Sequence, residues 1–310
     1  MTIIEAPGEL GGKGRKVCAA IGMFDGVHLG HQQVIHQTLA DAEGCEAWAV
    51  VLTFDRHPNT VVAPDRAPPL IYSLPQKLRA IEKLGVDVAC VLPFTEAFSR
   101  LSADEFVRGL VRDFGALRSV CVGSDFTFGY KRGGNVKVLR QLGDELGFRV
   151  HGLGAVSLDG QVVRSTRIRE AVRAGQLDTA SQLLGRKYAV SGLVKAGEQV
   201  GRKLGFPTAN LDVGGLVLPP GGVYAAHALV EGKSWRCVAN LGFRPTRQDA
   251  APALMLEAHL LDFNGQLYGK DVELAFECKL REEQKFPSLE ALREQIARDI
   301  AAARGVFEAN

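Results

Sequence analysis

Short apolar runs alternate with helical patterns over residues from about 16 to 185. Runs of apolar and β-branched residues predict buried strands at Val17–Ile21, Trp48–Phe54, Val86–Leu92 and Ser119–Val122. Apolar residues that recur every three or four positions predict helices at His31–Asp41, Pro75–Leu84, Ala103–Phe114 and Val136–Leu146. This alternation indicates an α/β fold of the Rossmann-like class, with a parallel sheet and helices on both of its faces.

The pattern changes after about residue 185, where strand-like runs follow one another with only turn signals between them. These runs are Val190–Val194, Val223–Val230, Trp235–Ala239, Leu254–Asp262 and Val272–Lys279. One helical pattern, Ser288–Ala303, closes the chain. We therefore predict a small antiparallel β-barrel with a terminal helix, and we divide the chain into domains 1–185 and 186–310.

Composition narrows the class of protein. The chain has 310 residues, of which 46% are hydrophobic and 23% charged, which suits two globular domains. The net charge of +2 gives no reason to expect nucleic acid or a membrane surface as a partner. No apolar run approaches the about 20 residues of a membrane span, and the start lacks the pattern of a secretory signal. Six scattered cysteines without a Cys-x-x-Cys pair favour a reduced, cytoplasmic compartment.

A glycine-rich stretch, residues 20–31, joins the first predicted strand to the first predicted helix. Such a turn makes an anion site, because free backbone N–H groups point outward and glycine lets a phosphate approach. His28 and His31 lie three residues apart and project to one side of the first helical turn. A partly buried polar face is the simpler explanation of this pair. Zinc is another, although no third ligand follows at a useful spacing.

Two further stretches carry residue types that bind phosphate. Ser165 and Thr166 precede a helix, where hydroxyls either cap the helix or bind phosphate oxygens, and Arg169 can bind phosphate through two nitrogens. In residues 201–210, glycines and basic residues precede Thr208 and Asn210, which are suitable oxygen ligands for a hard cation. This stretch is not a P-loop, and a surface turn rich in small residues stays open as an alternative.

These motifs resemble a known family. Gly-x-Phe-Asp-Gly-x-His-x-Gly-His, ending at His31, is similar to the His-x-Gly-His signature of nucleotidylyltransferases, and residues 201–210 are similar to the riboflavin kinase signature. Together they resemble the bacterial bifunctional riboflavin kinase/FMN adenylyltransferase (FAD synthetase) family, in order from about Val17 to Ile300. Arg56 stands where that family usually has proline, and Arg164 where it has serine.

The resemblance implies two reactions, ATP-dependent phosphorylation of riboflavin to FMN and adenylyl transfer from ATP to FMN, which gives FAD and pyrophosphate. It implies catalytic roles for His28, His31 and Arg169 in the adenylyl transfer, and for Glu257 as the base of the kinase. ATP and phosphate are expected at Gly22, Phe24, Gly26, Gly30, Ser165, Thr166, Gly201, Arg202, Lys203, Gly205, Thr208 and Asn210. Flavin is expected at Phe54, Asp55, His57, Pro58, Asp125 and Phe128, and Mg²⁺ at Thr208 and Asn210.

Two other functions are compatible with part of this pattern. The barrel can be a flavin sensor without kinase activity, but Thr208, Asn210 and Glu257 together argue for a kinase, because a binding module needs no base. His-x-Gly-His also marks class I tRNA synthetases. That function requires a Lys-Met-Ser-Lys-like loop and a basic face for RNA, and the sequence has neither.

Overall fold

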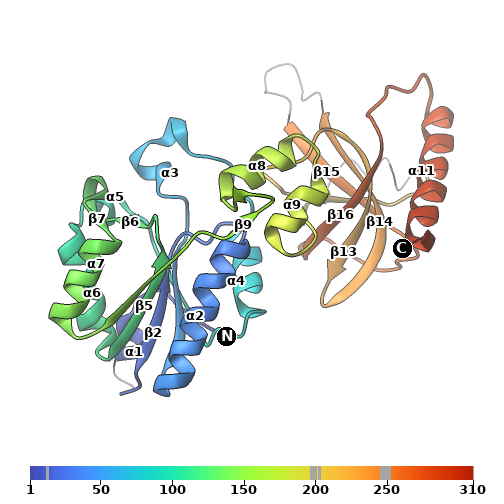
Figure 1. Ribbon diagram of the computed structural model, residues 1–310. Helices are drawn as coiled ribbons and strands as arrows, with labels where there is room; N and C mark the ends of the chain where they lie inside the picture. Colours follow the sequence, from blue (N-terminus) through green and yellow to red (C-terminus); the bar gives the residue numbers. More distant parts are fainter. Residues whose placement is uncertain (12–13, 196–200, 202–203, 245–252, 310) are drawn as a thin grey trace. The chain divides into compact units, whose positions relative to one another are not determined.

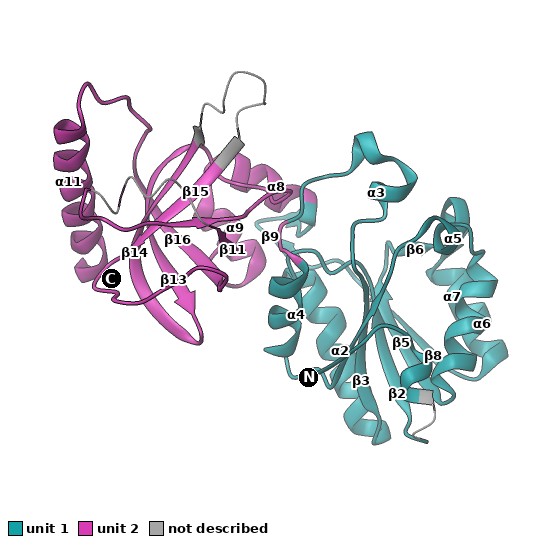
Figure 2. Ribbon diagram, turned by 180° about the vertical axis from the view of Figure 1, so that it is seen from behind, with its two compact units in different colours: residues 1–70, 74–165 teal, residues 71–73, 166–310 magenta. Residues whose placement is uncertain are grey.

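The computed structural model describes residues 1–11, 14–195, 201, 204–244 and 253–309. The chain forms two compact units, which are coloured separately in Figure 2. Unit 1 contains residues 1–70 and 74–165, and unit 2 contains residues 71–73 and 166–310. Helix α8 (Ser165–Arg173) crosses this boundary, and α9 (Leu177–Leu184) belongs to unit 2, where it contacts the barrel. The domain boundary at residue 185 stays a prediction. It lies about 20 residues after Ser165, where unit 1 ends.

Unit 1 is built on a six-stranded sheet of order β1-β4-β3-β2-β5-β8, in which every pair is parallel. The strands are β1 (Thr2–Ile4), β2 (Val17–Ile21), β3 (Trp48–Phe54), β4 (Val88–Leu92), β5 (Leu117–Gly123) and β8 (Arg149–Leu153). The predicted parallel sheet is therefore confirmed. Its inner strands are continuous apolar runs because both faces are covered.

Helices cover both faces of this sheet (Figure 1). Unit 1 contains the helices α1 (Gly8–Gly11), α2 (Leu29–Cys45), α3 (Asn59–Val62), α4 (Leu74–Glu82), α5 (Glu96–Ser99), α6 (Ala103–Phe114) and α7 (Val136–Leu146). Helices α2 and α4 pack on one face of the sheet, and α6 and α7 pack on the other. Strand β2 shows how the core divides, since Ala19 and Ile21 pack toward α6 and α7 while Ala20 packs toward α2 and α4. Short two-residue strands also occur: β6 (Thr127–Phe128), β7 (Gly134–Asn135), β9 (Ser157–Leu158) and β10 (Gln161–Val162).

Unit 2 contains a closed antiparallel barrel of order β11-β12-β15-β14-β13-β16, as the sequence predicts. The strands are β11 (Ala189–Lys195), β12 (Ala209–Leu211), β13 (Gly222–Val230), β14 (Lys233–Arg244), β15 (Ala253–Leu260) and β16 (Asp271–Arg281). Inside, Phe276 stacks on Tyr188 and meets Tyr224 edge-on. Outside, α11 (Leu289–Ala309) packs Ala303 and Phe307 on the barrel. Among the described helices, none is long and apolar enough to cross a membrane.

Closure of the barrel depends on a glycine at one crossing point. A Cβ at Gly192 of β11 would lie 2.2 Å from the backbone oxygen of Asp212, which cannot move aside as a flexible side chain can. We expect Gly192→Ala to lower the free energy of unfolding of unit 2 by about 3 kcal/mol, as overpacking does. Urea unfolding followed by circular dichroism measures the change.

Gly305 of α11 is the matched control, because a Cβ there meets nothing within 4 Å. Gly305→Ala should stabilise the helix by about 0.5–1 kcal/mol. Equal stability of the two variants would contradict the tight crossing at Gly192.

Candidate active sites

The turn between β2 and α2 is strained. Phe24 and Val27 have φ angles of 50° and 42°, in the left-handed region that side chains rarely adopt, and Gly26 has a φ of 81°. Backbone strain of this kind costs on the order of 1–3 kcal/mol per residue and persists only where the surroundings enforce it. Gly22 makes room for the turn, because a Cβ there would lie 3.2 Å from the Phe24 ring.

The two predicted histidines meet at the first turn of α2. Their rings stack with centroids 3.6 Å apart, and His28 caps the helix by accepting the His31 backbone N–H at its Nδ1 (3.3 Å). A Cβ at Gly30 would lie 3.2 Å from the His28 ring, so this glycine permits the pairing. The start of a helix has backbone N–H groups and a partial positive charge that attract anions. The geometry thus combines two imidazoles with a helix N-terminus.

A buried lysine, Lys77 of α4, joins this turn to the end of β3. Its Nζ donates to the Met23 carbonyl (3.2 Å), the Thr53 hydroxyl (2.9 Å) and the Phe54 carbonyl (2.8 Å). Burial lowers the pKa of Lys77 to about 8, although Asp25 and Asp55 oppose the shift. Sequence reasoning missed Lys77. The signal was present, since Lys77 lies four residues before buried Ile81 on the inner face of α4.

The predicted flavin residues after β3 take part in local hydrogen bonds. Asp55 accepts the Phe94 backbone N–H (2.8 Å) and Arg56 Nε (2.9 Å). Partial burial raises the pKa of Asp55, but these bonds outweigh it and hold the pKa below the usual value. His57 Nδ1 accepts the Asn59 N–H (3.1 Å), and Pro58 precedes α3. Arg56, the departure from the family pattern, thus pairs with the adjacent carboxylate.

Phenylalanine rings connect two of the predicted flavin residues. Phe54 meets Phe98, Phe98 meets Phe106, and Phe106 meets Phe128, with centroids 5.6, 5.8 and 5.9 Å apart. Phe126 stacks on Phe128 at 5.3 Å. Phe54 and Phe128 therefore belong to one aromatic cluster.

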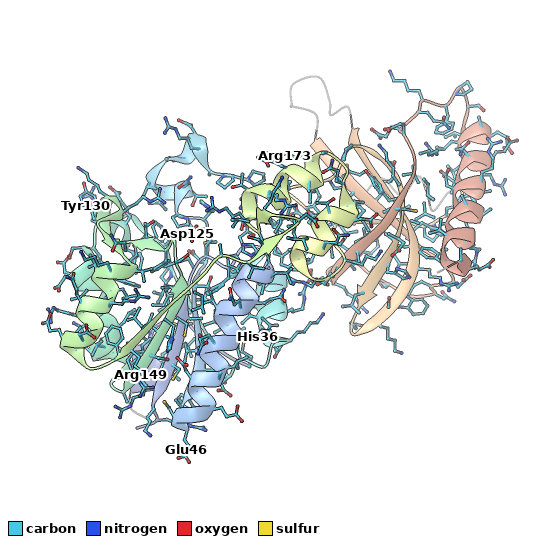
Figure 3. The ribbon with its side chains drawn as sticks, viewed as in Figure 1. His36, Glu46, Asp125, Tyr130, Arg149 and Arg173 are labelled. Carbon is cyan, nitrogen blue, oxygen red and sulfur yellow. The ribbon has the colours of Figure 1, made fainter. Side chains whose placement is uncertain are left out.

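The remaining predicted residues of the first site are divided between the two units. Ser165 donates its hydroxyl to the Asp25 carbonyl of the strained turn (3.2 Å). Asp125, labelled in Figure 3, is exposed, and its Oδ2 lies 3.6 Å from Arg164 Nη2. Arg164, which stands where the family usually has serine, thus has an acidic neighbour, as Arg56 does. Thr166 and Arg169 belong to unit 2, and their placement beside the histidines stays a prediction.

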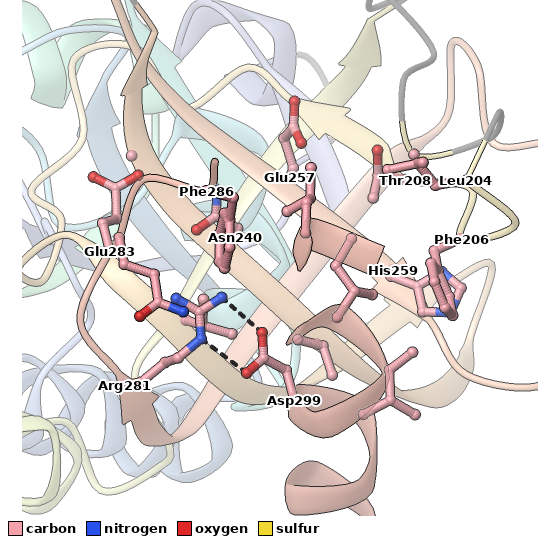
Figure 4. Close-up of a pocket in the computed structure, with 18 of the residues that line it drawn as sticks. Leu204, Phe206, Thr208, Asn240, Glu257, His259, Arg281, Glu283, Phe286 and Asp299 are labelled. Carbon is pink, nitrogen blue, oxygen red and sulfur yellow. Dashed lines mark hydrogen bonds and ion pairs between the residues drawn. The ribbon is translucent and has the colours of Figure 1, made fainter. Parts of the chain in front are cut away.

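Unit 2 contains a pocket of about 360 Å³ between the outer face of the barrel and α11 (Figure 4). Its volume is that of a small-molecule site. Apolar side chains of both elements line it, and Thr208, Asn240, Glu257 and Phe286 line it as well. A second hollow of about 390 Å³, between Val194 and Tyr268, shares Thr208 with the first. Thr208 thus lies where two ligands can meet.

Strand register aligns three polar residues on the pocket side of the barrel. Asn210 of β12 lies opposite Glu257 of β15, and Glu257 lies opposite Asn240 of β14. Directly opposed residues have their side chains on one face, about 5 Å apart. Asn210 is buried, and its Oδ1 has no hydrogen-bond partner among the described residues. The row therefore offers a carboxylate flanked by two amides, with an oxygen left over for a ligand.

Gly201 closes the turn that leads to this row. Its carbonyl accepts the N–H groups of Leu204 (3.1 Å) and Phe206 (2.8 Å), and a Cβ would lie 2.5 Å from the Phe206 carbonyl. Gly205 has a φ of 90°. Arg202 and Lys203 lie outside the described residues.

One ion pair at the pocket was not foreseen. Arg281 of β16 binds both oxygens of Asp299 on α11, at 2.8 and 2.7 Å (Figure 4). Asp299 is buried, and this two-pronged bond joins the helix to the barrel beside the pocket. In the sequence, the position of Asp299 next to Ile300, on the inner face of the terminal helix, could have indicated that Asp299 is buried.

Comparison with known proteins identifies a family for each half of the chain. The family model described as FAD synthetase matches residues 12–167, and that described as riboflavin kinase matches residues 184–307. A bifunctional riboflavin kinase/FMN adenylyltransferase from Pseudomonas fluorescens is 39% identical over 292 residues, covering 94% of this chain and 93% of that protein.

The chain belongs to the bifunctional riboflavin kinase/FMN adenylyltransferase family. Relatives with that name in Escherichia coli and Bacillus subtilis are 37% and 36% identical, and this chain covers 91% and 90% of their lengths. Both activities of the family, riboflavin kinase and FMN adenylyltransferase, thus reside in one chain.

The same fold occurs in a solved structure. A chain titled macrolide-efflux protein from Streptococcus pneumoniae matches with a TM-score of 0.81 and 27% identity, over 97% of this chain and 98% of that one. We take from it the fold alone.

Proposed function

We propose that the chain forms FMN in unit 2 and adenylylates FMN at the turn between β2 and α2. The observation that carries this division is that each unit has its own arrangement suited to phosphate chemistry. Unit 1 has stacked His28 and His31 at a helix N-terminus, and unit 2 has Glu257 between two amides beside a pocket.

In the adenylyl transfer, a phosphate oxygen of FMN attacks the α-phosphorus of ATP, and pyrophosphate leaves. Negative charge grows on the phosphate oxygens as the bonds exchange, so fixed donors stabilise the transition state. The N–H groups of α2, with His28 and His31, serve as these donors, and Ser165 of the same unit adds a hydroxyl. Thr166 and Arg169 of unit 2 keep the phosphate-binding roles that the family resemblance implies. Glycines at 22, 26 and 30 allow the phosphates to approach the backbone, and the Phe24 ring meets the His31 ring edge-on.

The flavin of this reaction binds near the aromatic cluster of unit 1. Phe54 and Phe128 belong to that cluster, and Asp55, His57, Pro58 and Asp125 lie on the loops next to it. Aromatic rings favour offset or edge-on contact with a planar ring system. Arg164 stands beside Asp125 at 3.6 Å and adds positive charge there.

In the kinase reaction, Glu257 takes the proton of the ribityl 5′-hydroxyl of riboflavin. The freed oxygen attacks the γ-phosphorus of ATP, and ADP leaves. The apolar pocket under α11 suits the flavin ring, and the second hollow suits the nucleotide, because Thr208 lines both. A sensor without kinase activity gives no reason for a carboxylate at this place.

Thr208 and Asn210 fit a role in holding Mg²⁺ with ATP. Neutral oxygens are suitable ligands for this hard cation, which keeps most of its coordination for phosphate and water. The buried Asn210 Oδ1, without a hydrogen-bond partner among the described residues, is the observation that supports the fit. When bound, Mg²⁺ neutralises charge on the phosphate oxygens.

The substrates are small molecules, and we place the chain in the cytoplasm. All six cysteines are free, as expected for a reducing compartment.

Glu257→Gln tests the kinase assignment. The amide cannot accept the hydroxyl proton, so we expect riboflavin phosphorylation to fall about 10²- to 10⁴-fold, while supplied FMN is still converted to FAD. Chromatography of FMN and FAD separates the two rates. Glu294→Gln, at an exposed position of α11, is the control and should change neither. An unaltered kinase rate in Glu257→Gln would remove Glu257 from the role of base.

His28→Ala tests the adenylyltransferase assignment. Loss of one donor should lower FAD formation from FMN about 10²- to 10³-fold and leave riboflavin phosphorylation near the wild-type rate. His36→Ala is the control, since His36 is exposed on the same helix (Figure 3). If FMN formation also collapses in a folded His28→Ala protein, the assignment of two separate sites is wrong.

A further inference from the structure

Lys77 uses all its hydrogen-bonding capacity on two backbone segments of unit 1. An ammonium has three N–H donors and no acceptor. Those of Lys77 go to Met23, Thr53 and Phe54, and the residue is only 3% exposed. The lysine therefore lies beneath the protein surface and does not reach out to a substrate.

The bonded atoms lie directly beside the residues assigned to adenylyl transfer. Met23 precedes Phe24, whose φ of 50° begins the strained turn. Phe54 ends β3, just before Asp55. The Thr53 hydroxyl donates to the same Met23 carbonyl (3.0 Å), so lysine and threonine together fix that carbonyl from two sides. A strained conformation persists only under such constraint.

Burial of the Lys77 ammonium costs free energy, because the charge is removed from water. We infer that its hydrogen bonds have a role beyond filling space. Methionine or leucine would fill the same space without the cost of removing an ammonium from water. The charges that act on Lys77 are Asp25, in the strained turn, and Asp55, after β3, and both favour the ammonium form. The lysine thus carries positive charge between the two loops while it bonds their backbones.

We propose that Lys77 is a positioning residue of the adenylyltransferase, whose ammonium holds the β2–α2 turn against the end of β3 in the conformation that binds the phosphates of ATP. This role for Lys77 rests on the proposed function of that turn, and it adds to that function a residue that does not contact the substrate.

The proposal predicts a dependence on pH. Burial lowers the pKa of Lys77 to about 8, so the ammonium is charged below that pH and loses a proton as the pH rises through it. The neutral amine has two donors, and one of the three bonds is lost. The kcat of FMN adenylylation should therefore fall above pH 8, while riboflavin phosphorylation by the same samples shows no such fall.

Lys77→Met is the direct test, with the full chain assayed for both reactions from pH 6.5 to 9.5. Because misplacement of reacting groups by about 1 Å can cost 10²-fold, we expect adenylylation at pH 7 to fall 10- to 100-fold. The fall near pH 8 should also disappear, with riboflavin phosphorylation unchanged. Lys83→Met is the matched control, since Lys83 is exposed just after α4. Thr53→Val, which removes one partner, should give a smaller loss.

Three results would overturn the proposal. The first is a Thr53→Val protein with the wild-type kcat, which decides the matter even if Lys77→Met does not fold. The second is Lys77→Met with the wild-type kcat. The third is Lys77→Met with the same fall near pH 8, which would assign that titration to another group. His28→Ala, assayed alongside, separates failure of this proposal from failure of the proposed adenylyltransferase site. If FMN adenylylation is impaired in His28→Ala and not in Lys77→Met, only the role of Lys77 is wrong. If it is impaired in neither variant, the proposed site is wrong.

Discussion

The negative charge of a triphosphate must be met by donors that are in place before the nucleotide binds, because donors that reorganise during the reaction lose much of their effect. In unit 1 we assign this role to the backbone N–H groups at the start of α2, which follow the sharp turn between Ile21 and Leu29. That turn includes two side-chain-bearing residues with positive φ, so its conformation depends on its surroundings. The interactions that hold it are those of Thr53, Lys77 and Ser165.

In unit 2, strand register fixes the positions of the polar side chains. Closure of the barrel determines which residues stand opposite one another. A shift of one residue in β12 or β15 would turn Asn210 or Glu257 to the other face of the sheet. The Arg281–Asp299 pair then holds α11 over the pocket. Under the proposed function, two folds without common topology each present fixed polar groups to phosphate.

Much of the architecture could be predicted from local pattern. The bounds of β2, β3, α6 and α7 agree with their predicted ranges, because their apolar runs are continuous and their caps, such as Ser102 of α6, lie in the adjacent sequence. Strands β1 and β8 escaped prediction. They lie at the sheet edges, where β1 has only three residues and β8 has no buried side chain. Strand β12 was not predicted from the sequence, because its three residues form a strand only by pairing with β11 and β15.

Candidate residues that belong to a contiguous motif could be identified from the sequence, whereas those that depend on long-range contacts could not. The helix N-terminal histidines follow from spacing alone. Lys77 and Asp299 do not, since each matters through partners 18 or more positions away. Arg56 and Arg164 looked like departures from a pattern, and the structure gives each an acidic neighbour, Asp55 and Asp125. Such compensation cannot be seen until the residues are placed in space.

The central claim is that one chain has two separate phosphate sites, and a crystal structure with a non-hydrolysable ATP analogue, Mg²⁺ and FMN tests it most directly. The account predicts nucleotide density at two places. One lies at the start of α2, with phosphates beside His28 and His31, and the other lies against Thr208 and Asn210. Density at a single place, or phosphates distant from both groups of residues, would contradict it.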